Sequence, residues 1–101
     1  MAILRLQETP QAQTDLDGIE DFLAARDPDA AVRVIHAVAQ TYQSILDWPE
    51  LGTLLPYKGV RMRLVSGFSQ FLVLYQFESP VVTIVRVIRA SQDWTRVLPD
   101  Q

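Results

Sequence analysis

The chain has 101 residues, 49% of them apolar and 21% charged, a composition that argues against a disordered segment or a coiled-coil array. This length leaves room for one core, so we expect residues 1–101 to form a single domain. There is no Cys and one His, His36, which excludes disulfides, thiolate catalysis and a zinc site with several His or Cys ligands. We therefore expect neither a metal nor another cofactor, and a surface position for His36.

The sequence also bears on location and charge. No stretch approaches the ~18 consecutive apolar residues of a membrane-spanning helix, and the first eight residues lack the features of a signal peptide, so we expect a cytoplasmic protein. Residues 1–50 carry three arginines against nine acids, whereas residues 51–101 carry six cations against three acids. The net charge of −3 argues against sequence-specific or general nucleic-acid binding by the chain alone, while the basic second half suits an acidic partner.

A strand and a helix are expected first. Residues 2–7 form a short apolar run, typical of a strand. Thr9-Pro10 then predicts a helix over residues 10–25, because Thr is a good N-cap and Pro fits the first helical position. Spacing of three and four residues places an apolar stripe on one helix face, formed by Ala12, Leu16, Ile19 and Leu23. The acids of this helix are expected to form a solvated face, namely Asp15, Asp17, Glu20 and Asp21.

A second helix is expected directly afterwards. Asp27-Pro28 repeats the start signal and predicts a helix over residues 29–47. Because only one or two residues separate the helices, we expect an antiparallel hairpin. Trp48 precedes a proline and ends the helix, where it is expected to cap the core. Residues 48–59 are predicted to form a loop.

The second half of the chain has the pattern of a sheet. We predict strands over residues 60–65, 70–77 and 81–89, joined by short turns into an antiparallel meander. Residues 93–98 are expected to add a helical turn. The fold class is therefore α+β, with two layers: an N-terminal strand, a two-helix hairpin and a three-stranded meander, the hairpin covering one face of the sheet.

The alternation in residues 60–65 predicts that the first meander strand has two unlike faces. Val60, Met62 and Leu64 are expected to face the core, whereas Arg61 and Arg63 lie on the open face. Either Arg86 or Arg89 of the last strand shares that open face, and the register, which the sequence does not fix, decides between them.

Three stretches of the sequence resemble the ParE branch of the RelE/ParE toxin superfamily. They are Thr9-Pro10-x-Ala12-x-x-Asp15-Leu16-x-x-Ile19, then Leu46-x-x-Pro49-x-Leu51-Gly52, then Val60-Arg61 with Tyr75 and Ile84-x-Arg86-Val87-Ile88-Arg89-Ala90-Ser91-Gln92-Asp93-Trp94. Their order spans nearly the whole chain, and the order of strand, hairpin and meander matches the family fold. The sequence departs from many relatives at Arg89-Ala90, where they have His-Gly, and at Gln92, where they have Arg.

The resemblance implies a bacterial toxin of a type II toxin–antitoxin pair of the kind linked to plasmid stabilisation, neutralised by a small co-expressed antitoxin. ParE-like toxins are associated with inhibition of DNA gyrase, and we expect this chain to act in that way, by binding rather than as an enzyme. The antitoxin is expected to cover an apolar groove beside outward arginines with an amphipathic helix or an added strand, and to contribute acidic side chains.

Five residues are expected to bind the target or the antitoxin: Arg61, Arg63, Arg86, Arg89 and Trp94. Arg86 lies inside an apolar run, so it either faces a groove or forms a structural ion pair. A local salt bridge between Arg89 and Asp93 is the favoured interpretation of that pair. Trp94 either packs on the sheet or meets a partner, and the sequence does not separate these alternatives.

Two other functions stay open. In a ribosome-dependent mRNA endoribonuclease of RelE type, Lys58, Arg61, Arg63 and Arg86 would hold phosphate, and Tyr75 or Arg89 would move protons. The alternative for Tyr75 is core packing, since Val73 and Phe77 share its strand face. The third possibility is an inactive homologue that only forms the complex. The acidic net charge and the absence of His from the strands favour the binding toxin.

Overall fold

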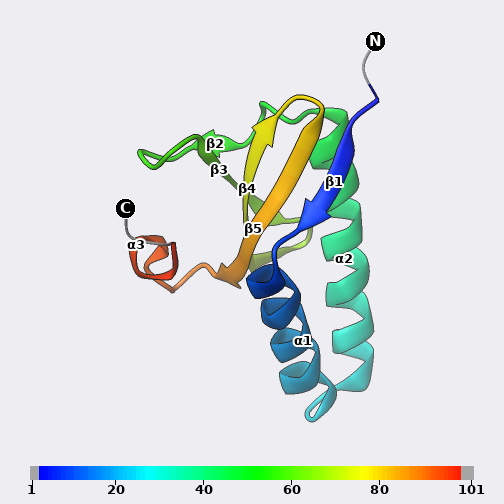
Figure 1. Ribbon diagram of the computed structural model, residues 1–101. Helices are drawn as coiled ribbons and strands as arrows, with labels where there is room; N and C mark the ends of the chain where they lie inside the picture. The colour runs from blue at the N-terminus through cyan, green and yellow to red at the C-terminus, as the bar shows by residue number, and fades with distance from the viewer. Residues whose placement is uncertain (1–2, 99–101) are drawn as a thin grey trace.

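A computed structural model describes residues 3–98 and confirms the α+β class (Figure 1). The elements in chain order are β1 (Arg5–Glu8), α1 (Pro10–Ala24), α2 (Pro28–Asp47), β2 (Thr53–Leu54), β3 (Val60–Val65), β4 (Phe68–Glu78), β5 (Val81–Arg89) and α3 (Trp94–Val97). The strands form one sheet in the order β1-β5-β4-β3-β2. β3, β4 and β5 make the predicted antiparallel meander, and β1 joins it by pairing parallel to β5.

The helical hairpin forms as its capping residues predict. The Thr9 hydroxyl accepts a hydrogen bond from the Ala12 N–H at 3.1 Å, and the Asp27 carboxylate accepts one from the Ala30 N–H at 3.2 Å. Both helices lie along one face of the sheet (Figure 1), and their apolar stripes pack in one cluster with side chains of the strands. The cluster between helices and sheet contains residues of both layers, among them Ala12, Val34, Val38, Ile45, Val73, Tyr75, Val82, Ile84 and Val87.

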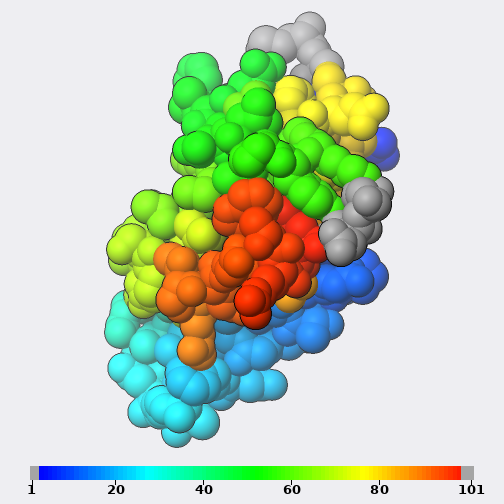
Figure 2. Space-filling model, turned by 90° about the vertical axis from the view of Figure 1, so that its left-hand side faces the viewer, coloured from blue at the N-terminus to red at the C-terminus, as the bar shows by residue number. Residues whose placement is uncertain are grey.

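The opposite face of the sheet carries a second apolar cluster. Its buried residues are Leu55, Val60, Leu72, Leu74, Ile88 and Leu98. The loop before β3 and the C-terminal segment around α3 cover this face, as Figure 2 shows in green and in orange to red. The two covers meet where the rings of Tyr57 and Trp94 pack edge to face, 6.4 Å apart between their centroids. Apolar side chains are therefore buried on both faces of the sheet.

This second cluster overturns the predicted faces of β3. Arg61 pairs across the sheet with Tyr75 and Arg63 with Val73, and both partners belong to the cluster under the helices. The arginines thus lie on the helix side, whereas Val60 and Met62 belong to the other face and Leu64 is 51% exposed. Alternation shows which side chains share a face, but it does not show which face is covered.

The remaining differences concern element ends and one tryptophan. The first strand begins at Arg5 instead of residue 2, because pairing starts opposite Val81 at the beginning of β5; position 2 lies outside the described residues. The predicted loop contains the two-residue strand β2, which pairs with β3. β4 begins at Phe68, two residues early. Trp48 is 63% exposed, so the prediction that it caps the core is wrong.

Candidate functional site

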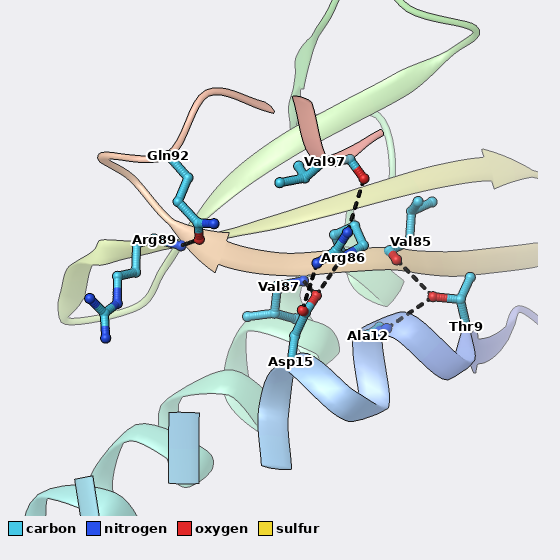
Figure 3. Close-up of polar contacts among 9 residues, drawn as sticks. All are labelled: Thr9, Ala12, Asp15, Val85, Arg86, Val87, Arg89, Gln92 and Val97. Atoms are coloured by element: carbon cyan, nitrogen blue, oxygen red, sulfur yellow. Dashed lines mark hydrogen bonds and ion pairs between the residues drawn. The ribbon is translucent and has the colours of Figure 1, made fainter. Parts of the chain in front are cut away.

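The last part of β5 has a free edge that α1 covers. β1 pairs with β5 only as far as Glu8 opposite Ile84, and α1 begins immediately afterwards. The Thr9 hydroxyl donates to the Val85 carbonyl at 2.7 Å, and the Val87 N–H donates to the Asp15 carboxylate at 3.0 Å (Figure 3). Polar side chains of α1 therefore replace the missing strand and hold the helix along this edge.

Arg86 is bound at the same edge by an ion pair with Asp15. The Arg86 guanidinium donates to the two carboxylate oxygens at 2.7 and 2.8 Å and to the Val97 carbonyl at 2.9 Å (Figure 3). The two side chains are only 23% and 14% exposed, and the hydrogen bonds to Asp15 raise the pKa of Arg86. Of the two alternatives for Arg86, the structural ion pair is the one formed. The expectation that Asp15 lies on a solvated helix face is wrong, because its carboxylate is needed at the edge.

A groove continues from this edge between the second half of α1 and the end of β5. It has a volume of about 490 Å³ and is mostly apolar, with a lining formed by Ile19, Phe22, Leu23, Gln70, Phe71, Arg89, Ala90 and Ser91. In Figure 2 the orange turn after β5 lies beside the blue residues of α1. We call this feature the α1–β5 groove.

Two cations stand over the aromatic ring at the rim of the α1–β5 groove. Phe22 is 43% exposed, and the guanidinium carbons of Arg26 and Arg89 lie 3.8 and 4.9 Å from its ring centroid. Within residues 3–98 neither arginine forms an ion pair with a carboxylate. An apolar groove with two uncompensated cations at its rim suits a ligand that offers an apolar side chain next to carboxylates.

The salt bridge expected between Arg89 and Asp93 is not formed. The Asp93 carboxylate instead caps α3: it accepts hydrogen bonds from the Thr95 hydroxyl at 2.7 Å and the Thr95 N–H at 3.0 Å, and it lies 3.9 Å from Arg96. The hydrogen bonds from Thr95 lower the pKa of Asp93. The Arg89 guanidinium instead lies over the Phe22 ring. The backbone N–H of Arg89 donates to the Gln92 side-chain oxygen at 2.9 Å.

The arginines of β3 hold a loop. The Arg61 guanidinium donates to the carbonyls of Glu50 and Gly52, both at 2.9 Å, and Arg63 donates to the Ser44 hydroxyl at 2.7 Å. Arg61 thus contacts the loop after α2, and Arg63 contacts the end of α2. Their expected role in binding stays a prediction. Both guanidinium groups donate inside the protein, although within residues 3–98 the buried Nη1 of Arg63 has no hydrogen-bond partner.

Tyr75 of β4 binds the same loop through its hydroxyl. Its fully buried hydroxyl donates to the Pro49 carbonyl at 2.9 Å and accepts from the Gly52 N–H at 3.0 Å. A Cβ atom at Gly52 would lie 2.3 Å from this hydroxyl, so the close approach requires glycine. Burial raises the pKa of Tyr75, against the opposing effects of the Gly52 hydrogen bond, Arg63 and Arg61. We call Tyr75, Arg61 and Gly52 the loop clamp.

The other candidates are placed as follows. Trp94 packs against Tyr57 in the second apolar cluster, which is the packing alternative. Lys58 and His36 are exposed, and the surface position predicted for His36 is confirmed. The sequence reasoning missed Phe22 and Arg26, although a signal was present: Phe22 lies off the apolar stripe of its helix, and Arg26 follows at the four-residue spacing that places side chains side by side.

Two further observations concern metal binding and membrane-spanning helices. Among residues 3–98, no three His, Cys, Asp or Glu side chains lie close enough together to hold a metal ion. In the same part of the chain, no helix has the length and apolar character needed to cross a membrane.

Comparisons with known proteins agree with this geometry. Residues 6–94 match the profile of the family described as ParE toxin of type II toxin-antitoxin system, parDE. Y4kP of Sinorhizobium fredii, a toxin candidate, is 31% identical over 98 residues, which are 97% of this chain and all of that protein.

Two solved structures share the fold. The chromosomal ParDE TA system from P. aeruginosa has a chain that superimposes with a TM-score of 0.72 at 21% identity, covering 86% of this chain and 96% of that one. YafQ from E. coli superimposes with a TM-score of 0.58 at 11% identity, over 87% and 94% of the two chains. These likenesses confirm the RelE/ParE-like fold, and the sequence matches establish that the chain belongs to the ParE family of toxins of type II toxin–antitoxin systems.

Proposed function

We propose that this toxin acts in the cytoplasm by binding DNA gyrase, and that a small antitoxin neutralises it by seating an acidic, amphipathic segment in the α1–β5 groove. One observation carries the choice of binding over catalysis: four of the six side chains that a nuclease would use are engaged in internal contacts, Lys58 and Arg89 being the exceptions. Arg86 is paired with Asp15, Arg61 holds the loop after α2, Arg63 donates to Ser44 of α2, and the Tyr75 hydroxyl is buried.

General acid–base chemistry needs a group within hydrogen-bond reach of the reacting atom and with a pKa near the working pH. The Tyr75 hydroxyl meets neither condition, because Pro49 and Gly52 occupy it and burial raises its pKa further from neutrality. The phosphate of an RNA would also have to compete with backbone carbonyls for Arg61. These facts favour a toxin that inhibits through contact.

The groove supports the antitoxin part of the proposal. Its floor offers apolar side chains of α1 and β4, and its rim offers Arg26 and Arg89 above Phe22. An amphipathic helix could bury its apolar face on this floor and bring carboxylates to the two cations. The two cations at the rim attract carboxylates locally. RNA would need cations to neutralise many phosphates, which a chain with a net charge of −3 disfavours.

The test of the target compares two assays on one purified toxin. Plasmid supercoiling by gyrase should be inhibited and the inhibition relieved by antitoxin, while mRNA on translating ribosomes should stay intact. If mRNA is cleaved while supercoiling stays normal, the gyrase proposal is wrong and the toxin is a ribonuclease. Loss of both activities with antitoxin binding retained would identify an inactive homologue.

The test of the groove uses charge reversal. Arg26→Glu and Arg89→Glu together should weaken antitoxin binding strongly at low salt, because an acidic segment would then face two like charges. Arg5→Glu combined with Arg33→Glu is the matched control, since it changes the net charge by the same amount and both exposed arginines lie outside the groove lining. Equal losses in the control and in the groove double variant would show that overall charge, not the groove, governs binding.

A further inference from the structure

The loop after α2 exposes three large apolar side chains within seven residues. Trp48 is 63%, Leu51 68% and Leu54 57% exposed. We call these three residues the apolar tip. Several exposed apolar side chains grouped together on a small protein usually mark an interaction surface, whereas single ones are ordinary. The function argued so far makes no use of them.

The backbone beneath the apolar tip is held firmly. The loop clamp fixes the carbonyls of Pro49, Glu50 and Gly52 and the N–H of Gly52, and the Leu51 N–H donates to the Trp48 carbonyl at 3.1 Å. This hydrogen bond closes a turn between Trp48 and Leu51. Leu54 pairs across the sheet with Arg61, the residue whose guanidinium reaches back to this turn. The buried contacts thus fix a loop whose largest side chains stay uncovered, an arrangement that lowers the entropy cost of binding.

Charge indicates what kind of partner fits. Two exposed acids, Asp47 and Glu50, alternate with the apolar tip along the loop, and Arg61 is occupied by carbonyls. An acidic border repels nucleic acid. It also disfavours a second copy of the chain, because a two-fold contact would set the same acids against each other. A protein with an apolar pocket bordered by Lys or Arg is the complementary partner.

The apolar tip is well separated from the α1–β5 groove. The groove lies near the turn that joins α1 to α2, and the apolar tip follows the other end of α2 (Figure 1). The helix α2, 20 residues and about 30 Å long, separates that turn from the apolar tip. A ligand in the groove therefore leaves the apolar tip uncovered unless it also reaches along the whole helix.

We propose that the apolar tip is the surface through which the toxin grips its protein target, a pocket with an apolar floor and a basic border. This inference rests on the proposed function in so far as it requires a protein target, and it adds where the target is bound. Trp48 is the main anchor, because aromatic residues at the centre of a contact usually contribute most to affinity.

The experiment replaces the apolar tip and leaves the groove intact. Trp48→Ser combined with Leu51→Ser is compared with Val32→Ser, a matched control because Val32 is 70% exposed on α2. Binding to purified gyrase, binding to antitoxin, thermal unfolding and cell killing at matched expression are measured for each. The double variant should bind gyrase at least ~30-fold more weakly, the effect of losing one hot-spot residue or more, and should no longer kill. Its antitoxin affinity and unfolding midpoint should stay near those of the control.

Every other outcome of this experiment either supports or overturns the proposal. Wild-type gyrase affinity and killing in the double variant would overturn the proposal, and so would a loss of antitoxin affinity in place of gyrase affinity. If wild-type toxin fails to bind gyrase, the proposed target is wrong, and the killing assay then tests the apolar tip. Abolished killing in the double variant would support another protein target bound at the apolar tip. Retained killing would overturn the proposal for the apolar tip. Leu51→Ser alone serves if the double variant unfolds.

Discussion

The ion pair between Asp15 and Arg86 gives the most direct test of how the fold uses its charged residues. Asp15→Ala removes the acceptor of two hydrogen bonds from Arg86 and one from the Val87 N–H. Breaking a fully buried pair costs about 3–5 kcal/mol. Because 23% and 14% of the two side chains stay exposed, we expect a loss of about 2–4 kcal/mol in the free energy of unfolding.

The measurement is a double-mutant cycle by urea denaturation. Asp15→Ala, Arg86→Ala and the double variant are compared, with Asp17→Ala as control, since this exposed acid of the same helix should change stability by less than about 0.5 kcal/mol. The double variant should be less destabilised than the sum of the single variants by about 1–3 kcal/mol, because it leaves no unpaired charge. Additive losses would refute the ion pair. Unchanged stability in Arg86→Ala together with weaker partner binding would restore Arg86 as an interface residue.

Three further predictions concern the loop clamp with its buried Tyr75, and the partly buried Tyr42. Gly52→Ala places a Cβ atom 2.3 Å from the Tyr75 hydroxyl and should cost about 1–3 kcal/mol by urea denaturation, and a wild-type midpoint would contradict the close approach. Tyr75→Phe leaves the Gly52 N–H and the Pro49 carbonyl unpaired, so stability should fall by about 1–3 kcal/mol. Cell killing at matched amounts of folded toxin should stay near that of the wild type. Lost killing without lost stability would favour the nuclease. Burial and the hydrogen bond to Glu8 raise the pKa of Tyr42 above its usual 10.0. The stability that this shift gives the folded protein is complete below pH 10. It declines as pH rises further, because the unfolded chain then loses a proton that the folded chain retains. Tyr42→Phe should make this alkaline decline shallower in denaturation curves from about pH 9 to about pH 11, and a slope equal to that of the wild type would contradict it.

The parts of the fold that could be predicted are those that depend on neighbouring residues. Thr9-Pro10 and Asp27-Pro28 start the helices because a side-chain cap and a fixed proline dihedral act within one turn. Alternation over residues 60–65 and the apolar, β-branched runs that follow likewise identified all three meander strands to within two residues. These signals do not require knowledge of the tertiary structure.

The candidate site was less predictable because its contacts join distant segments. Asp15 and Arg86 are 71 residues apart, and no local pattern indicates that an acid on a polar helix face will replace a missing strand at a sheet edge. The face on which Arg61 and Arg63 lie was predicted wrongly for a related reason. The sheet is covered on both faces, so an arginine opposite an apolar row need not face solvent. Here Arg61 reaches backbone carbonyls of the loop after α2, and Arg63 reaches the Ser44 hydroxyl near the end of α2.

A β-bulge explains why Arg86 tolerates its position in an apolar run. Leu74 pairs with Arg86 and Tyr75 with Ile84, so Val85 is an extra residue in β5. In an unbroken strand Arg86 would lie on the same face as Ile84, in the buried cluster under the helices, where an unpaired charge costs several kcal/mol. The bulge shifts the alternation by one residue, so that Ile84 and Val87, three apart, both face that cluster. Arg86 is thereby turned to the opposite face, where it pairs with Leu74 of the second apolar cluster. There, at the free edge of β5, the Asp15 carboxylate and the Val97 carbonyl accept its hydrogen bonds.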